Sequence, residues 1–315
     1  MTSYTFEEIA TDQNFDEKAY LLANSDVADA VRNATLKSGR RHFETFGKNE
    51  NRKIRFPSSI ISEAKKRKLE KIKPLLRADM QCIETSTYYD FLSEELRSKF
   101  NIVDTDAVSS NGYDAYGMDL IKKNADGLVL DCGAGKRPVY FDNVVNFEIV
   151  DYDTTDVRGV GEVLPFIDGA FDVVLSLAVL EHVKDPFLCA REIARVLKPG
   201  GSLMCCVPFL QPLHGYPHHY YNMTGQGLEN LFVDYLAIDK ITTYESIYPI
   251  WSLTWILRSW VAGLQGKTRE DFTQMRVADL MEDADRYLNM PFVKELSTEK
   301  NLELASATVL FAHKR

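Results

Sequence analysis

The pattern of apolar and polar residues changes character near Gly127. After this point, short runs rich in valine and leucine alternate with amphipathic segments, as expected for strands covered on both faces: LVLDCG, VNFEIVDYD, FDVVLSLAVL and GSLMCCVPF. Between the last two runs, DPFLCAREIARVLKPGG predicts a helix with Asp185 as its N-cap and Pro186 in its first turn. This alternation predicts an α/β fold with a doubly wound, mostly parallel sheet. The tail LELASATVLFAHKR predicts a closing strand.

The residue pattern before residue 99 predicts helices rather than alternating strands and helices. Residues 15–33 and 35–52 predict two short amphipathic helices, and residues 62–77 carry five lysines and two arginines on a further predicted helix. We interpret the basic helix as a solvated link between domains rather than a site for an anionic partner. The expected division is therefore a helical module over 1–57, a basic helical linker over 58–98 and an α/β domain over 99–315.

Composition narrows the class of protein. The 46 acidic and 37 basic residues give a formal net charge of -9, which disfavours a nucleic-acid partner. Five cysteines without a C-x-x-C pair favour a reducing, cytoplasmic location. The first residues lack the features of a secretory signal, and the apolar run Tyr248–Leu264 contains Arg258 and is short for a membrane span. We expect no transmembrane segment, and a buried or lid helix over this run.

The stretch VLDCGAGKRPVYFD predicts a ligand-binding turn. Asp131 ends the first predicted strand of the sheet, and Gly133 and Gly135 allow a tight turn that brings backbone amides close to a ligand at the start of the next predicted helix. Pro138 stands where a dinucleotide fold has its third glycine, and it cannot donate to a phosphate. Asp151, which we expect at the end of the second strand, is placed to accept ribose hydroxyls. These residues predict a ligand with a ribose and no pyrophosphate, and count against NAD.

The motifs that follow resemble those of a known family. LPF, FDVV, LEHV and RVLKPGG are similar to the motifs of class I S-adenosylmethionine-dependent methyltransferases of the type 11 kind, over residues 127–232 and the final strand. The resemblance implies a seven-stranded sheet and S-adenosyl-L-methionine as cofactor. It assigns the methionine moiety to Asp131, Gly133 and Gly135 and the ribose to Asp151. The adenine is expected near Leu164, Pro165 and Phe166, with Glu162 as the candidate for its amino group, and His182 is expected to be a positioning residue near the cofactor. Lys136 and Arg137 are expected to face solvent.

The loop after the fourth predicted strand, PFLQPLHGYPHHYYNMTGQGL, is the expected acceptor site, because open α/β sheets hold ligands at the carboxyl ends of their strands. His214 is either the general base or a histidine that orders the loop, and His219 is the second candidate base. Substrate contacts are expected from Tyr216, Tyr220 and Tyr221. His214, His218 and His219 have no nearby carboxylate in the sequence, so no metal site is predicted.

The resemblances together suggest an acceptor. YLLANSDVADAV and SGRRHFETFGKNENR in the N-terminal module resemble a short module of bacterial surface-polysaccharide synthesis proteins, which implies partners of that kind. The acceptor loop resembles that of relatives associated with glycan modification. The sequence therefore predicts a methyltransferase (EC 2.1.1) that O-methylates a sugar hydroxyl of a bacterial surface glycan. The alternatives are another small-molecule hydroxyl or amine as acceptor, or a non-catalytic binding or scaffold protein with this fold.

Overall fold

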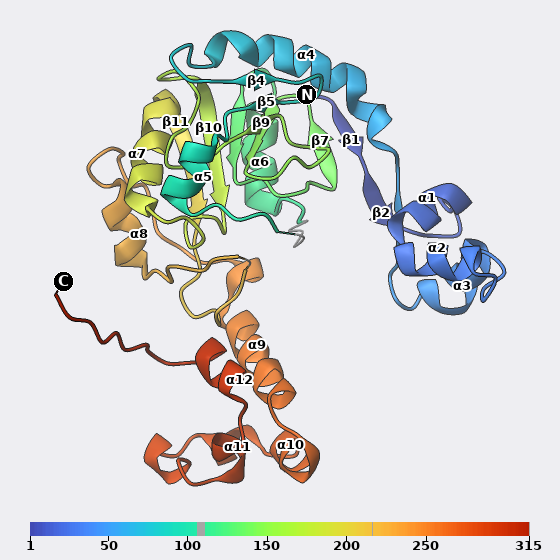
Figure 1. Ribbon diagram of the computed structural model, residues 1–315, viewed down its shortest axis with the longest axis vertical. Coiled ribbons are helices and arrows are strands. Elements are labelled where there is room, and N and C mark those ends of the chain that lie inside the picture. Colours follow the sequence, from blue (N-terminus) through green and yellow to red (C-terminus); the bar gives the residue numbers. More distant parts are fainter. Residues whose placement is uncertain (106–110, 216, 315) are drawn as a thin grey trace.

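The computed structural model describes residues 1–105, 111–215 and 217–314. Its centre is a seven-stranded sheet in the order β11-β10-β6-β8-β9-β5-β4, and each neighbouring pair is parallel except β4 and β5 (Figure 1). This confirms the predicted α/β fold with a mostly parallel sheet. The strands are β4 (Ile83–Glu84), β5 (Tyr89–Asp90), β6 (Val129–Cys132), β8 (Val144–Glu148), β9 (Val157–Arg158), β10 (Phe171–Leu177) and β11 (Leu197–Cys206).

Helices cover both faces of the sheet. One face packs with α4 (Ser62–Ile72), α7 (Pro186–Val196) and α8 (Gly225–Phe232), and Leu130, Val174 and Phe166 are fully buried beneath them. The other face packs against α6 (Ala115–Lys123) through Ile121, Val129 and further side chains of β8 and β10. Helix α7 begins as predicted, since the Asp185 carboxylate accepts from the Leu188 amide at 3.0 Å. Burial on both faces explains why these strands are apolar at consecutive positions.

Two local predictions near the turn are wrong. No helix follows the turn after β6; residues 133–138 lead instead into β7 (Val139–Phe141). A connection between neighbouring parallel strands needs about a dozen residues to hold a helix, and Pro138 with the β-branched and aromatic residues after it favours extended backbone. The second strand, β8, ends at Glu148 rather than at Asp151, which lies exposed in the following loop.

Residues 58–98, expected to form a linker, take part in the sheet domain. Strands β4 and β5 extend the sheet, and α4 buries Leu69 and Ile72 in its core. Lys68 of this basic helix is wholly buried, with its ammonium 3.0 Å from the Asp156 carboxylate and beside the Tyr140 ring. Short α5 (Glu94–Phe100) follows. We therefore propose that the methyl-transfer domain begins near residue 58 rather than at 99.

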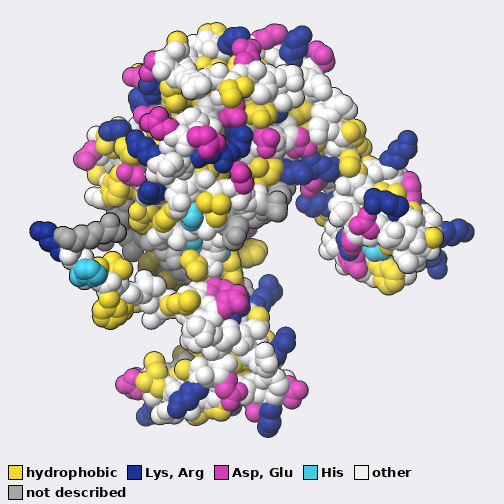
Figure 2. All heavy atoms as spheres, in the orientation of Figure 1, with side chains coloured by type: hydrophobic (Ala, Val, Ile, Leu, Met, Phe, Trp, Pro, Cys, Tyr) yellow, Lys and Arg dark blue, Asp and Glu magenta, His cyan; other side chains and the backbone are white. Residues whose placement is uncertain are grey.

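The N-terminal module is a lobe of its own beside the sheet domain (Figure 2). It contains α1 (Glu17–Ala23), α2 (Ser25–Arg32) and α3 (Gly39–His42), which continues as a π-helical turn through Gly47. Tyr20, Phe43 and Ile54 form its buried core. Strand β1 (Ser3–Thr5) pairs with β7, while β2 (Glu7–Ile9) pairs with β3 (Lys53–Arg55). The extreme N-terminus thus belongs to the sheet domain.

The C-terminal region is a second helical lobe (Figure 1). Helices α9 (Pro249–Ala262), α10 (Gly266–Thr273), α11 (Pro291–Lys294) and α12 (Thr298–Glu303) pack around Leu264, Phe272 and Phe292. Helix α9 is not a buried helix, because Trp251 is 58% exposed. Among the described residues, no helix is long and apolar enough to cross a membrane.

The predicted closing strand is also wrong. The last described residues, 305–314, form no strand, and Leu310 is 88% exposed. This tail leaves α12 away from the sheet, so its apolar residues have no neighbouring strand to pair with (Figure 1). Two of the seven strands, β4 and β5, come instead from a segment before the predicted start of the α/β domain.

Candidate functional site

The turn after β6 is built for close approach to a ligand. Gly133 and Gly135 have φ values of 84° and 63°, a region that L side chains rarely adopt. A Cβ on Gly133 would lie 2.5 Å from a methyl group of Val179, which is in the loop after β10. The turn is therefore packed directly against the loop that carries the LEHV motif, and both lie at the carboxyl ends of the strands.

The buried carboxylate of Asp131 is paired with the guanidinium of Arg137. Its Oδ2 accepts from Nε and Nη2 of Arg137, each at 2.7 Å, and from the Tyr113 hydroxyl. Arg137, which we expected to face solvent, is itself only 6% exposed and stacks on the Tyr113 ring. This pairing neutralises the carboxylate charge. Oδ1 of Asp131 is buried and has no hydrogen-bond partner within the described part of the chain, so it keeps a lone pair for a ligand donor.

The acidic side chain that reaches the turn is Glu148, at the end of β8. Its Oε2 accepts from the Gly135 amide at 2.7 Å, and its Oε1 accepts from the Ile149 amide at 2.8 Å. Burial raises the pKa of Glu148. Each carboxylate oxygen can accept a further hydrogen bond, so Glu148 offers what two ribose hydroxyls need. Asp151, the residue predicted for this role, lies three positions further along and is exposed.

The residues predicted to surround an adenine are mainly structural. The side chains of Leu164 and Phe166 are fully buried in the core. Their carbonyl oxygens accept from the Arg195 guanidinium, at 3.0 and 2.7 Å. Glu162 accepts from the amides of Lys184 and Asp185 at the start of α7, at 3.1 and 3.3 Å. Pro165 is buried between its two neighbours. These contacts anchor α7 to the LPF segment, and explain that motif without a ligand.

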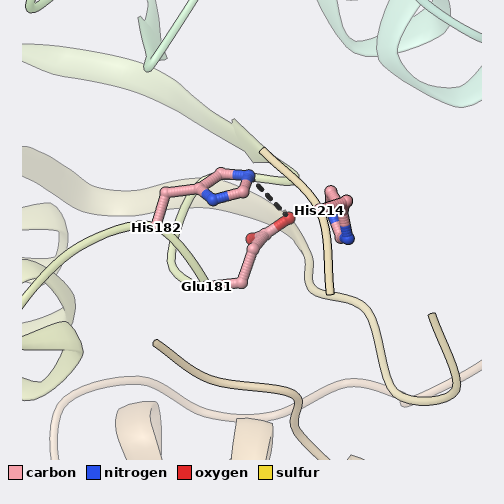
Figure 3. A group of neighbouring side chains, drawn as sticks. All are labelled: Glu181, His182 and His214. Carbon is pink, nitrogen blue, oxygen red and sulfur yellow. Dashed lines mark ion pairs between the residues drawn. The ribbon is translucent and has the colours of Figure 1, made fainter. Parts of the chain in front are cut away.

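A second buried carboxylate, Glu181, lies in the loop after β10. Both of its oxygens are buried and have no hydrogen-bond partner among the described residues, and burial raises the pKa of its carboxyl to about 7. Oε1 lies 3.7 Å from Nε2 of His182. One carboxylate oxygen of Glu181 and one ring nitrogen each of His182 and His214 all lie within 4.8 Å of one another (Figure 3).

The hydrogen bonds of the histidines fix where their ring protons sit. Nδ1 of His182 lies 2.7 Å from the carbonyl oxygen of His218, and Nδ1 of His214 lies 2.8 Å from that of Pro212. A carbonyl can only accept, so each Nδ1 carries a proton and each Nε2 keeps its lone pair. Burial lowers the pKa of both rings, which favours the neutral form.

His219 is held differently, although its ring is 4.3 Å from that of His214. Its Nδ1 accepts from the His214 backbone amide at 3.0 Å, so its Nε2 carries the proton, 3.0 Å from Oδ1 of Asn222. Both nitrogens are therefore engaged in ordering the loop. The amides of Tyr220 and Tyr221 donate to the Glu181 carbonyl, at 2.7 and 3.2 Å. Tyr216, the third predicted substrate contact, lies outside the described residues.

Comparison with known proteins identifies the class of domain to which this part of the chain belongs. Residues 105–205, which run from just before α6 to β11, match the family model described as a methyltransferase domain. The chain contains a class I methyltransferase domain. The matched span includes Asp131, Glu148 and Glu181, so the turn and the LEHV loop both belong to the methyltransferase domain.

Similar proteins cover only parts of the chain. An uncharacterized methyltransferase of Mycobacterium sp. (strain JLS) is 44% identical over 61 residues, 19% of this chain and 24% of the relative. The uncharacterized protein YafE of Escherichia coli is 30% identical over 122 residues, 33% of this chain and 56% of the relative. The chain thus spans about a quarter of the first of these relatives and about half of the second.

One solved structure is a Thermotoga maritima protein described as a SAM-dependent methyltransferase and possible histamine N-methyltransferase. It has 21% identity and a TM-score of 0.28, and the match covers 38% of this chain and 69% of that one.

Sequence reasoning missed three residues of the site. Glu148 was overlooked because the apolar run continues past it to Val150, which moved the expected strand end to Asp151. In the sequence, Glu181 stands only as part of the LEHV motif, although an acidic residue inside a strand-to-helix loop is itself a signal. Nothing in the sequence shows that the partner of Arg137 is Asp131, so the sequence predicts a solvent-facing side chain there.

Proposed function

We propose that the protein is an S-adenosylmethionine-dependent methyltransferase that transfers a methyl group to a hydroxyl of a small molecule. The observation that carries this proposal is the packing of Gly133 against Val179. It holds the Asp131 turn beside the loop with Glu181 and His182. A cofactor seated on the turn would lie next to a cluster of groups that can receive an acceptor proton.

The turn suits the proposed cofactor. The unpartnered Oδ1 of Asp131 can accept from its amino group, and Glu148 can accept from both ribose hydroxyls. No helix begins at the turn to hold a pyrophosphate, which counts against NAD. When bound, S-adenosylmethionine supplies a sulfonium methyl group, to which an acceptor oxygen bonds while the C–S bond breaks and leaves its electron pair on sulfur.

The residues of this chain then have to orient the acceptor, exclude water and receive its proton. The group that fits is the acceptor cluster, which we define as Glu181, His182 and His214. All three members present lone pairs, whereas both ring nitrogens of His219 are occupied. We therefore propose that the proton leaves to the acceptor cluster and that His219 positions His214.

The substrate class rests on chemistry and on resemblance. A sugar hydroxyl has a pKa far above neutrality and needs help to lose its proton, which an amine in its neutral form does not. The lone pairs of the acceptor cluster therefore favour a hydroxyl. The likeness of the acceptor loop and of the N-terminal module to proteins of glycan modification supports a sugar of a bacterial surface glycan. We propose that Tyr220 and Tyr221 contact the substrate. We also propose that the N-terminal module contacts polysaccharide-synthesis partners.

The free cysteines, of which Cys132 and Cys189 are buried, support a reducing, cytoplasmic setting. The alternatives are a different small-molecule hydroxyl or amine, and a binding protein without turnover. Calorimetric titration should detect S-adenosylmethionine and its demethylated product and give no signal with NAD. A screen of nucleotide sugars and glycan fragments with methyl-labelled cofactor should then yield a labelled sugar. Binding without transfer to any hydroxyl or amine would favour the binding protein, and NAD binding alone would refute the proposal.

A further inference from the structure

The acceptor cluster has an unusual chemical feature: the ring N–H groups of its two histidines are used by backbone carbonyls, and the groups that remain free are acceptors. Glu181 is fully buried, and neither of its oxygens has a hydrogen-bond partner in the residues that the structure describes. Burying a carboxylate without a partner is costly unless a ligand or ion supplies the missing interaction. The nitrogens of His182 and His214 that keep a lone pair add two more acceptors. Such a group of lone pairs is satisfied by a cation.

The hydrogen bonds of the two rings are those that metal ligands make. A metal-bound histidine usually donates its other ring N–H to a carbonyl or carboxylate, which fixes the tautomer and the direction of the lone pair. His182 and His214 each make this bond, to the carbonyls of His218 and Pro212. The 3.7 Å between Nε2 of His182 and Oε1 of Glu181 is near the separation of about 3.4 Å that two ligands take at bonds of ~2.1 Å.

We propose that Glu181, His182 and His214 bind a divalent transition-metal cation. Two imidazoles and one carboxylate suit Zn²⁺, Mn²⁺ or Fe²⁺, whereas Mg²⁺ and Ca²⁺ prefer oxygen ligands alone. The sequence did not predict a metal site, because the loop histidines have no carboxylate near them in the chain. The fold brings Glu181 to them from the loop after β10.

The consequence for the reaction rests on the proposed function. Three protein ligands leave coordination positions open, as in catalytic rather than structural metal sites. A hydroxyl bound at an open position would become more acidic, so its proton could pass to solvent without a dedicated base. His214 and Glu181 would then hold the cation, and neither would need to take the proton itself.

Metal binding can be measured without cofactor or acceptor. The full-length protein, stripped with a chelator, is titrated with Zn²⁺ and with Mn²⁺ alone by calorimetry, and one ion per chain should bind. Glu181→Gln and His214→Ala should each weaken binding by more than the roughly 10–100-fold that loss of an outer partner costs. His313→Ala, in the exposed tail, is the matched control for adventitious surface binding, and should bind as the parent does.

The outcomes separate the two proposals. Binding of one ion that is lost in Glu181→Gln and in the more exposed His214→Ala, with both variants folded by circular dichroism, supports the site. Equal binding by the parent and both variants, or no binding at all, overturns it. Methyl transfer by metal-free protein would leave the proposed function intact and reduce the acceptor cluster to a proton acceptor. A bound ion without any cofactor binding would contradict the proposed function alone.

Discussion

Asp131 and Glu181 are both fully buried carboxylates at the same edge of the sheet, yet their hydrogen-bond partners differ. Asp131 has Arg137 and Tyr113 against one oxygen, so its charge is compensated within the chain. Glu181 has no hydrogen-bond partner among the described residues, and Nε2 of His182, 3.7 Å away, presents a lone pair to it. The charge of Asp131 is therefore balanced by the protein itself. The charge of Glu181 has no hydrogen-bonded cation among the described residues to balance it.

This difference distinguishes binding from chemistry. A paired carboxylate keeps one geometry and offers a fixed lone pair, which suits recognition of a cofactor. An unpaired buried carboxylate is destabilising by itself, and such cost is commonly found at functional sites. We therefore expect changes around Asp131 to affect folding and cofactor binding, and changes around Glu181 to affect turnover.

The largest expected effect is on turnover at the acceptor cluster. His214→Ala should lower single-turnover methyl transfer by about 10²–10⁴-fold, whether the ring binds a metal or takes a proton, because the acceptor hydroxyl then keeps its proton. Cofactor affinity should stay close to that of the parent. His219→Ala is the matched control; its ring only orders the loop, so we expect a loss below about 10-fold. If the losses are reversed, His219 is the functional ring.

Removing the cation that pairs with Asp131 tests the other half of the comparison. Arg137→Met should lower the free energy of unfolding by about 3–5 kcal/mol, because it leaves a buried carboxylate uncompensated. Chemical denaturation would measure this, and the double variant Arg137→Met/Asp131→Asn should recover most of the loss. Glu181→Gln should be neutral or stabilising, since it removes an unpaired charge. Equal destabilisation by Arg137→Met and Glu181→Gln would show that the two carboxylates do not differ in how their charge is balanced.

Asp156, another buried carboxylate, is paired with a lysine, and this pair should make the free energy of unfolding depend on pH. Burial lowers the pKa of its partner Lys68 to about 8, whereas an unfolded lysine titrates near 10.4. Between these two pH values the unfolded chain binds more protons than the folded chain. Raising the pH therefore disfavours the unfolded state, and the free energy of unfolding rises by up to about 3 kcal/mol. Denaturation from pH 8 to 10 should show this gain in the parent and not in Lys68→Met. A parent curve parallel to that of Lys68→Met would mean that the lysine is not perturbed.

The smallest effect is expected from the N-terminal module. Ile9 and Lys53 are paired across β2 and β3, so residues 10–52 can be replaced by an Asn-Gly turn that keeps both strands. Cofactor affinity should stay within about 0.5 kcal/mol of the parent. A truncation at Ser58 is a harsher change, because it removes β1 and the bond from the Phe6 amide to the Pro138 carbonyl beside the turn. A large loss of affinity in the loop replacement would make the module part of the site.

The sequence predicted what depends on local pattern. The strands of the sheet, the Asp185 cap of α7 and the glycine turn follow from apolar runs, capping residues and special backbone angles, which are written in neighbouring residues. Partners distant in the chain were not predictable in this way. Arg137 with Asp131, Lys68 with Asp156, and Glu181 with His214 meet only because of the fold. The exposed tail and the β-strand after the turn depend on which segments are free to pair.

The most direct test of the central claim, that the Asp131 turn and Glu148 hold the cofactor, is calorimetric titration of S-adenosylmethionine into two matched variants. Glu148→Gln should lose about 1–3 kcal/mol of binding free energy, because an amide cannot accept from both ribose hydroxyls and also from the Gly135 amide. Asp151→Asn, exposed three residues away, should bind within about 0.5 kcal/mol of the parent. The reverse result, with Asp151→Asn impaired and Glu148→Gln unaffected, would contradict the account.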